Sequence, residues 1–194
     1  MTPSSPLRRG LFAWLWRRPQ RWFLLGIPAG ALVAFIAGMI AWASFVGGLK
    51  YAETDSFCTS CHEMKQPYRE LAHSAHFSNP LGIQASCGNC HVPPTFLPGL
   101  WRHIQAYAEV WGHMGGELNT PAKYEAHRLE LAQKIWTELK SNDSAECRSC
   151  HTPSQMAFAK QPPMAAAAHS SLASSGMTCI DCHRGVAHTL PQGG

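Results

Sequence analysis

The 194-residue sequence has no excess of positive charge outside its first 21 residues. Sixteen Lys and Arg residues stand against 12 Asp and Glu residues, which gives a net charge of +4. Five arginines, at positions 8, 9, 17, 18 and 21, precede any acidic residue, so the remaining 11 basic and 12 acidic residues carry a net charge of −1. Nucleic-acid-binding proteins present clustered basic residues. The sequence therefore predicts no nucleic-acid partner.

Charge is absent altogether from Trp22 to Leu49, a run of 28 residues dominated by Leu, Ile, Val, Phe, Ala and Gly. About 20 apolar residues suffice for a helix to cross the hydrocarbon core of a bilayer. Trp22 and Trp42 lie near the two ends, as interfacial aromatic residues do. Residues 41–43, Ala-Trp-Ala, resemble a signal-peptidase site, but the apolar stretch is longer than the usual h-region of about 7–15 residues. We therefore expect a retained transmembrane anchor.

The five arginines also set the direction of this anchor, because the cytoplasmic flank of a transmembrane helix is enriched in Lys and Arg. Three segments are predicted: a basic cytoplasmic N-terminus over residues 1–21, a single-pass inner-membrane anchor over residues 22–49, and a periplasmic domain over residues 50–194.

No cysteine lies outside one repeated motif. All eight fall in four Cys-x-x-Cys-His runs: Cys58/Cys61/His62, Cys87/Cys90/His91, Cys147/Cys150/His151 and Cys179/Cys182/His183. Zinc sites and thiol–disulfide centres also use Cys-x-x-Cys, but neither explains a histidine in the same next position four times. Two thiols at this spacing can form thioethers to both vinyl groups of one porphyrin while the next histidine reaches the iron. The pattern predicts four covalently bound c-type haems.

Seven histidines lie outside the motifs, which is a surplus for a chain of this length. They are His73, His76, His103, His113, His127, His169 and His188. Low-spin haem iron takes a second axial ligand from elsewhere in the chain, so some of the seven are expected to be distal ligands. The segment after residue 50 has only scattered apolar stripes, and four porphyrins would supply much of its buried apolar surface. We predict a mainly α-helical multihaem cytochrome c domain with much irregular chain, which does not fold without haem.

The motifs form two pairs, over residues 58–91 and 147–183, separated by an insert with clear helix signals. Thr120 and Pro121 suit an N-cap and the first helical position, and strong helix formers follow. Because His127, Leu131 and Ile135 recur at helical spacing, we expect His127 on the buried side, as either a haem ligand or a hydrogen-bonded structural partner. A second helix is expected over residues 101–114, and prolines at 93, 94 and 98 place its start near residue 100.

Three stretches carry a resemblance to a known family: CTSCHEM at residues 58–64, YEAHRLELAQKIWTELKSNDSAECRSCH at 124–151 and MTCIDCHRGVAH at 177–188. With one N-terminal anchor and four haem motifs in two pairs, the sequence resembles the NapC/NirT family of tetrahaem quinol dehydrogenases over nearly the whole chain. Within that family, the electron donors to periplasmic nitrate reductase are most similar, because size and insert match and no domain for a fifth haem is added.

The resemblance implies that membrane quinol, either menaquinol or ubiquinol, is oxidised at the outer face and that electrons pass along the haems to a soluble periplasmic reductase. Nitrate reductase is the expected acceptor, and a reductase of nitrite or another substrate is the alternative. Two other functions stay open: a tethered or cleaved electron carrier that never contacts quinol, and a haem enzyme that reduces a small substrate such as nitrite itself. The retained anchor argues against the carrier, and the number of spare histidines argues against the enzyme.

The resemblance also implies iron ligands. Relatives with a Cys-x-x-Cys-His-x-Met run can bind the first haem iron through the methionine, which is Met64 here in place of His62. It further implies distal roles for His76, His169 and His188, with His127 a weaker candidate. Thioether ligation favours ferrous iron and raises the haem potential relative to two histidines, and an open face on that haem would admit a quinol headgroup. The alternative is that Met64 only packs on the porphyrin while His62 binds the iron.

Quinol oxidation releases protons and therefore needs a general base. Family members place a lysine and an acidic residue on the helix after the second haem motif. His103 occupies what looks like the lysine position, which exchanges a persistently charged donor for a group that titrates near neutrality, and Glu109 is the nearest acid. On an ideal helix the two lie about 120° apart, so a shared quinol site requires distortion or a different pairing. We expect His73 and His113 to be surface or packing residues.

Overall fold

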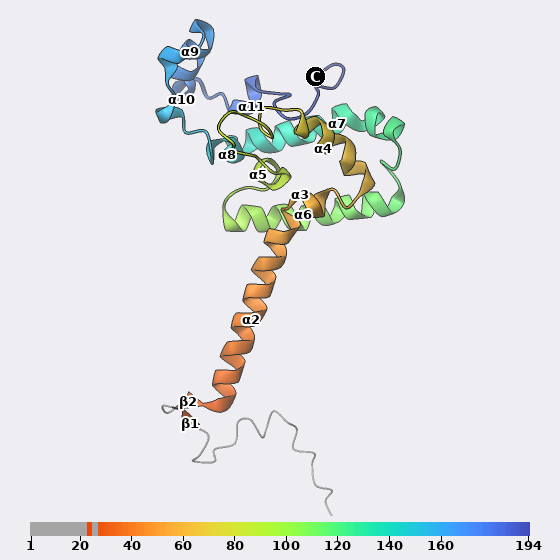
Figure 1. The fold of residues 1–194 in the computed structure, drawn as a ribbon, viewed down its shortest axis with the longest axis vertical. Coiled ribbons are helices and arrows are strands. Elements are labelled where there is room, and N and C mark those ends of the chain that lie inside the picture. Colours follow the sequence, from red (N-terminus) through yellow and green to blue (C-terminus); the bar gives the residue numbers. More distant parts are fainter. Residues whose placement is uncertain (1–22, 25–26) are drawn as a thin grey trace, which may run out of the picture. The chain divides into compact units, whose positions relative to one another are not determined.

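A computed structural model describes residues 23–24 and 27–194 and is mainly helical (Figure 1). The chain divides into two compact units, residues 1–48 and residues 49–194. In the first unit, β1 (Phe23–Leu24) and β2 (Ile27–Pro28) form an antiparallel pair, and these are the only strands in the described part of the chain. The predicted fold class is confirmed. The arginines of residues 1–21 and Trp22 lie outside the described residues.

The apolar run forms one long helix, α2 (Ala29–Ala52). This helix begins at Ala29 and not at the predicted start of the span, because Pro28 lacks an amide hydrogen and disfavours helical geometry in the residue before it. At 1.5 Å per residue its 24 residues measure about 36 Å, more than a hydrocarbon core of about 30 Å. Among the described helices it alone is long and apolar enough to cross a membrane, and most of its residues are exposed. It is therefore compatible with a single-pass inner-membrane anchor.

The second unit consists of short helices joined by irregular chain, with two longer helices among them. In order, these are α3 (Asp55–Cys58), η1 (His62–Met64), α4 (Lys65–Ala72), α5 (Cys87–His91), α6 (Phe96–Gly115), α7 (Pro121–Ser141), α8 (Ala145–Arg148), η2 (Pro153–Gln155), η3 (Phe158–Lys160), α9 (Pro163–Ser170), α10 (Leu172–Ser175) and α11 (Cys179–Cys182). Four of the short helices carry cysteines of the haem motifs.

The two longest helices of this unit run antiparallel, as Figure 1 shows for α6 (green) and α7 (teal), with the shorter helices α3, α4 and α5 drawn between them. Their contact includes ion pairs from Arg102 to Glu138 at 3.9 Å and from Lys134 to Glu109 at 3.4 Å. The predicted start of α7 is confirmed, because the Thr120 side chain accepts a hydrogen bond from the amide of Lys123.

The start predicted for the other long helix is wrong. Helix α6 begins at Phe96, because Pro98 falls in the first helical turn, where the missing amide hydrogen has no intrahelical partner to lose. It ends at Gly115, after which Gly116 adopts a left-handed φ of 69° that suits a residue without a Cβ atom.

Protein side chains alone form very little core in the described chain. Only three large apolar residues are buried: Leu71 on α4, Leu139 on α7 and Ile180 on α11. Polar contacts also hold α11 in place. Its Asp181 pairs with Lys140 of α7 at 2.7 Å, and the amide of its Ile180 donates to the hydroxyl of Ser144, which precedes α8. This sparse packing agrees with the expectation that bound porphyrins supply much of the buried apolar surface.

Candidate haem centres

Each Cys-x-x-Cys-His motif lies on or beside a short helical turn with its own capping contacts. The hydroxyl of Thr54 accepts from the amide of Phe57 before the first motif. Before the second and fourth motifs, Ser86 and Thr178 each form a capping box with the residue three positions later. A helical turn puts residues i and i+3 on one face, so both cysteines of a motif can face the same porphyrin. None of the eight cysteines forms a disulfide.

The first two motifs lie against each other. The carboxylate of Asp55 on α3 accepts a hydrogen bond of 2.8 Å from the amide of Cys87, the first residue of α5. The thiols of Cys58 and Cys87 interact, which lowers the pKa of Cys58 to about 7 and raises the pKa of Cys87. Gly88 also packs so closely on Glu53 that a Cβ atom would lie 2.6 Å from the Glu53 carbonyl oxygen.

The same adjacency continues along the remaining motifs. Helices α5 and α8 are in contact, which brings the second motif to the third. Burial raises the pKa of Cys90, and the nearby Cys150 thiol adds to this. Burial likewise raises the pKa of Cys147 to about 11, with the Cys179 thiol of the fourth motif next in effect. The four motifs therefore lie in space in the order in which they occur in the sequence.

Three motif histidines each face a histidine from elsewhere in the chain. The ring centroids of His91 and His188 are 6.2 Å apart, those of His151 and His76 are 6.2 Å apart, and those of His183 and His169 are 5.8 Å apart. Two metal–imidazole bonds of about 2 Å each, with the iron between the rings, require a centroid separation of about 6 Å. The spacing of these pairs therefore fits axial ligation of one haem iron by each pair.

Two of the three distal histidines are held by a hydrogen bond from Nδ1. Nδ1 of His76 donates to the carbonyl oxygen of Val186 at 3.3 Å, and Nδ1 of His169 donates to the side-chain oxygen of Gln161 at 2.7 Å. Nδ1 of His188 is buried without a hydrogen bond and lies 3.8 Å from a carboxylate oxygen of Glu70. Such outer contacts fix the tautomer and leave Nε2 to bind a metal.

Burial also favours the neutral imidazole that a metal requires. It lowers the pKa of His91 to about 4, with repulsion from His188 and Arg102 as the next causes. Burial likewise lowers the pKa of His188.

The first motif differs in its hydrogen bonding and not in its ring spacing, since the ring of His62 lies 5.9 Å from that of His113. Of the four motif histidines, all in the described chain, only His62 has a hydrogen bond on its ring, from Nε2 to the carbonyl oxygen of Asn119 at 3.2 Å. Its side chain is 58% exposed. Met64 instead lines a cavity together with Cys58, His91 and His188. The side chain that shares a cavity with the first and second motifs is therefore the methionine and not the adjacent histidine.

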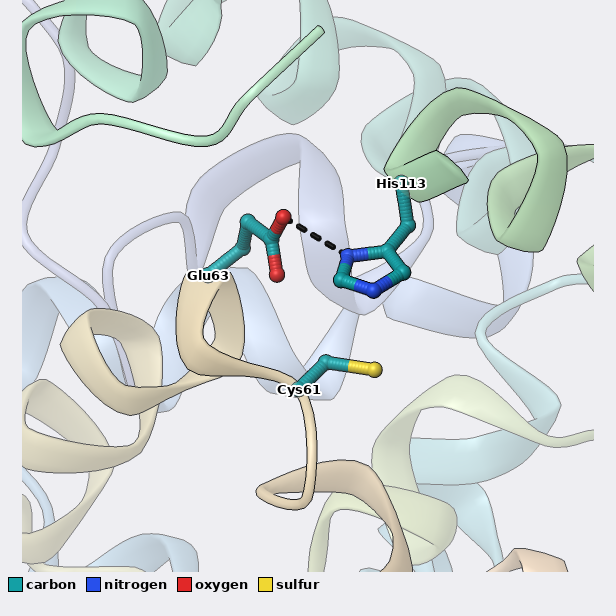
Figure 2. Close-up of side chains that lie close together, drawn as sticks. All are labelled: Cys61, Glu63 and His113. Atoms are coloured by element: carbon teal, nitrogen blue, oxygen red, sulfur yellow. Dashed lines mark hydrogen bonds and ion pairs between the residues drawn. The ribbon is translucent and has the colours of Figure 1, made fainter. Parts of the chain in front are cut away.

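Next to the first motif lies a cluster that the sequence did not reveal, made of Cys61, Glu63 and His113 (Figure 2). Their nitrogen, oxygen and sulfur atoms all lie within 4.8 Å of one another, and Nδ1 of His113 donates to Glu63 at 2.7 Å. Burial alone would raise the pKa of Glu63, but its backbone hydrogen bond and the bond from His113 lower it. The rings of His113 and His62 are 5.9 Å apart. His113 is an exposed residue, as expected, and its ring is held by Glu63.

The two residues predicted to contact quinol have different partners. His103 donates from Nδ1 to the carbonyl oxygen of Gly99 at 2.8 Å, while its Nε2 is buried without a hydrogen bond and lies 3.9 Å from a carboxylate oxygen of Glu53. Glu109 forms ion pairs with Arg102 at 2.9 Å and with Lys134 at 3.4 Å. Of the two side chains, only His103 has a buried polar atom without a hydrogen bond.

The expectation that His127 faces the buried side of α7 is wrong. The side chain of His127 is exposed, and its Nδ1 donates to the carbonyl of Lys123 one turn earlier. The neighbouring Arg128 faces inward instead, because its guanidinium pairs with Glu70 of α4. Within the described chain His127 makes no ring contact with another histidine, and neither does His73, whose Nδ1 donates to the carbonyl of Arg69.

Comparison with known proteins accounts for this set of features. The family described as "NapC/NirT cytochrome c family, N-terminal region" matches residues 22–193. The chain is 42% identical over 186 residues to the cytochrome c-type protein NapC of Escherichia coli (strain K12), covering 95% of this chain and 91% of the relative. It is 45% identical over 187 residues to the NapC protein of Paracoccus pantotrophus, covering 94% and 78% of the two chains.

A third relative, the denitrification system component NirT of Stutzerimonas stutzeri, is 38% identical over 185 residues, covering 95% of this chain and 90% of its own length. No solved structure matches. The family model and these relatives show that the chain belongs to the NapC/NirT cytochrome c family.

Proposed function

We propose that this protein is a membrane-anchored tetrahaem cytochrome that oxidises membrane quinol and passes the electrons to a periplasmic reductase. Family membership implies covalently bound c-type haem and electron transfer in periplasmic reductase systems. Beyond what family membership implies, we propose that the haems number four, that quinol is the electron donor and that a periplasmic reductase is the electron acceptor. The observation that carries it is the row of four adjacent motifs, three of which have a facing histidine at the separation of an axial ligand pair.

The described residues fit four haems. Each motif supplies two free thiols for thioether bonds. We assign His91 and His188 to the second haem, His151 and His76 to the third, and His183 and His169 to the fourth. The bound haems supply one-electron transfer. The protein places the attachment motifs next to one another in sequence order, so that an electron entering at one end of the row has a neighbour to reach at each step.

The first motif is the proposed entry point. We assign Met64 as its iron ligand, because the His62 ring nitrogen that would bind iron is engaged with Asn119. A thioether ligand favours ferrous iron and raises the potential relative to two histidines. The first motif also follows the end of α2 within six residues of Ala52, so it is the motif nearest in sequence to the membrane anchor. An N-terminus in the cytoplasm and a haem domain in the periplasm complete the proposed topology.

Two protons leave each quinol as it loses two electrons, and the protein must accept them. We propose His103 as the first proton acceptor, because its Nε2 is buried, lacks a hydrogen bond and faces Glu53. A general base must present such a free nitrogen to the proton that it removes. Glu109 is the weaker candidate, since Arg102 and Lys134 hold its carboxylate as an ion-paired anion.

Nitrate reductase is the proposed acceptor. The support is the resemblance in size and insert to the nitrate reductase donors of the family, together with the relatives named NapC. The relative named as a denitrification system component keeps another periplasmic reductase as the alternative.

The purified protein in liposomes tests this function. A menaquinol analogue should reduce the haems without any added dehydrogenase. Dithionite added afterwards should not increase the number of reduced haems. If quinol reduces them only after a separate dehydrogenase is added, the protein is a tethered carrier and the proposal fails. Adding purified periplasmic nitrate reductase with nitrate should reoxidise the haems, and nitrite reductase with nitrite should do so more slowly.

A further inference from the structure

Helix α6 has its polar and apolar faces the wrong way round for a helix on the surface of a soluble domain. Its inward face carries the buried Gly99 and the side chains of Arg102 and His103, which are 13% and 17% exposed. Its outward face carries large apolar side chains, among them Leu97, which is 72% exposed, and Trp101, which is 60% exposed. A surface helix in water normally turns its apolar stripe inward. This reversal indicates that the outward side of α6 does not face water.

The exposed side forms one continuous stripe, which we call the α6 apolar face. At about 100° per residue its members fall within roughly a quarter of the helix circumference, opposite Arg102. They are Leu97, Trp101, Ile104, Ala108 and Trp111. None of them is charged. The charged residues Arg102 and Glu109 of the same helix lie off this face and pair with Glu138 and Lys134 of α7.

The position of α6 within its unit points to the bilayer as the partner. His103 on the inward side lies 3.9 Å from Glu53, and Glu53 pairs with Lys50 at 2.7 Å. Lys50 and Glu53 are the first charged residues after the apolar run of α2, so the hydrocarbon core that α2 crosses must end near them. The middle of α6 therefore lies close to the residues at which the chain leaves the bilayer.

The composition of this face suits that position. Trp and Tyr concentrate at membrane interfaces, where an apolar ring and a polar edge are both accommodated. The α6 apolar face presents Trp101 and Trp111, and the 64% exposed Tyr107 lies beside it. Helices that lie in the interface plane bury an apolar face about 5–10 Å deep and keep their polar side chains away from the lipid, as α6 does.

We propose that α6 lies in the plane of the membrane interface with the α6 apolar face buried among the lipids, and that it thereby seats the haem domain on the bilayer. The inference rests on the proposed membrane anchoring by α2. Lipid contact along α6 would keep His103 and the first haem motif at the level of the quinol headgroups, which a single flexible tether would not do.

Photolabelling of the full-length haem-loaded protein tests this. The protein is reconstituted into phosphatidylethanolamine–phosphatidylglycerol vesicles that contain a phospholipid with a diazirine on its acyl chain, then irradiated and digested. Lipid adducts should appear on α2 and also on the segment 103–123, at Ile104, Ala108 or Trp111. The segment of α9 with Met164, which is 86% exposed, is the control for exposed apolar side chains that do not face lipid, and it should carry at least fivefold fewer adducts.

A double variant separates lipid contact from mere exposure. Ile104→Gln with Trp111→Gln should reduce adducts on segment 103–123 several-fold and leave the haem spectrum and the labelling of α2 unchanged, whereas Met164→Gln should change neither. If α2 is labelled but α6 carries no more adducts than α9, the proposed contact of α6 with lipid is wrong, whereas membrane anchoring by α2 still holds. Absence of adducts on α2 itself overturns the anchor, and the inference about α6 with it.

Discussion

At the scale of single residues, the first haem iron offers the sharpest choice between ligands. His62 directs Nε2 to Asn119, Met64 shares a cavity with Cys58, and the ring of His113 lies 5.9 Å from that of His62. Two arrangements compete: Met64 as ligand, or a fourth histidine pair of His62 with His113. The hydrogen bond to Asn119 favours methionine, because the ring nitrogen that would bind the iron is already used.

Met64→Ala should therefore change one haem and His62→Ala should not. The variant lacking the thioether is expected to lower the highest of the haem potentials by an amount on the order of 0.1 V, within the range of about 0.8 V that axial ligands control. Magnetic circular dichroism and a redox titration of the purified protein would measure this. Loss of the signal in His62→Ala and His113→Ala, with Met64→Ala unaffected, would show that the histidine pair binds the iron.

The distal assignments predict a specific loss for each histidine. His76→Ala, His169→Ala and His188→Ala should each convert one haem of the four to a high-spin or five-coordinate state, about a quarter of the iron, because each removes one facing imidazole. His127→Ala is the matched control, since that side chain is exposed and bonds only to Lys123. A change of spin state in His127→Ala equal to that in His188→Ala would contradict the assignments.

The free Nε2 of His103 predicts a kinetic defect. His103→Ala should slow reduction by a menaquinol analogue about 10²-fold or more, the usual contribution of a positioned general base, while reduction by dithionite stays unchanged. Glu109→Gln should have a smaller effect, because its carboxylate is already paired with Arg102 and Lys134. Stopped-flow spectroscopy in liposomes measures both rates. A larger defect in Glu109→Gln than in His103→Ala would exchange the roles of the two residues.

At the scale of elements, the contact between the chain after α2 and α5 depends on a glycine. A Cβ atom at Gly88 would lie 2.6 Å from the carbonyl oxygen and 2.8 Å from the Cβ atom of Glu53. Gly88→Ala should therefore destabilise the holoprotein by about 1–3 kcal/mol, as overpacking does. Gly115→Ala, where the nearest atom is 4.0 Å away, should change stability by no more than about 1 kcal/mol. Thermal unfolding followed at the Soret band compares the two, and equal melting temperatures would disprove the tight contact.

The helices also show how far a sequence can be interpreted. Thr120 and Pro121 predicted the start of α7 correctly, because capping is a local interaction. The periodicity over residues 101–114 predicted a helix but not which face lies inside, since spacing identifies a stripe and not its surroundings. For the same reason the spacing placed His127 inside, whereas a long-range ion pair to Glu70 turns the neighbouring Arg128 inward instead.

For the haem sites too, the sequence predicts what depends on neighbouring residues and misses what depends on residues far apart in the chain. The attachment cysteines were evident from spacing alone, because both thiols must reach one porphyrin. The partner of each motif histidine was not, because His76 and His151, or His91 and His188, are brought together only by the folded chain. The cluster of His113 with Glu63 likewise joins residues 50 positions apart and left no local signal.

At the scale of the whole molecule, the unit of residues 49–194 should depend on haem for its fold. Its buried apolar side chains, among the described residues, are Leu71, Leu139 and Ile180, and burial of apolar surface is the main force that offsets the conformational entropy of the chain. Covalently held porphyrins would add that surface in the middle of the unit. The same chain produced in a host without c-type haem attachment should therefore show reduced helicity and no cooperative thermal transition by circular dichroism, whereas the holoprotein should unfold cooperatively. A cooperative transition in the haem-free chain would show that protein contacts such as Arg128 with Glu70 and Lys140 with Asp181 suffice to hold the helices together.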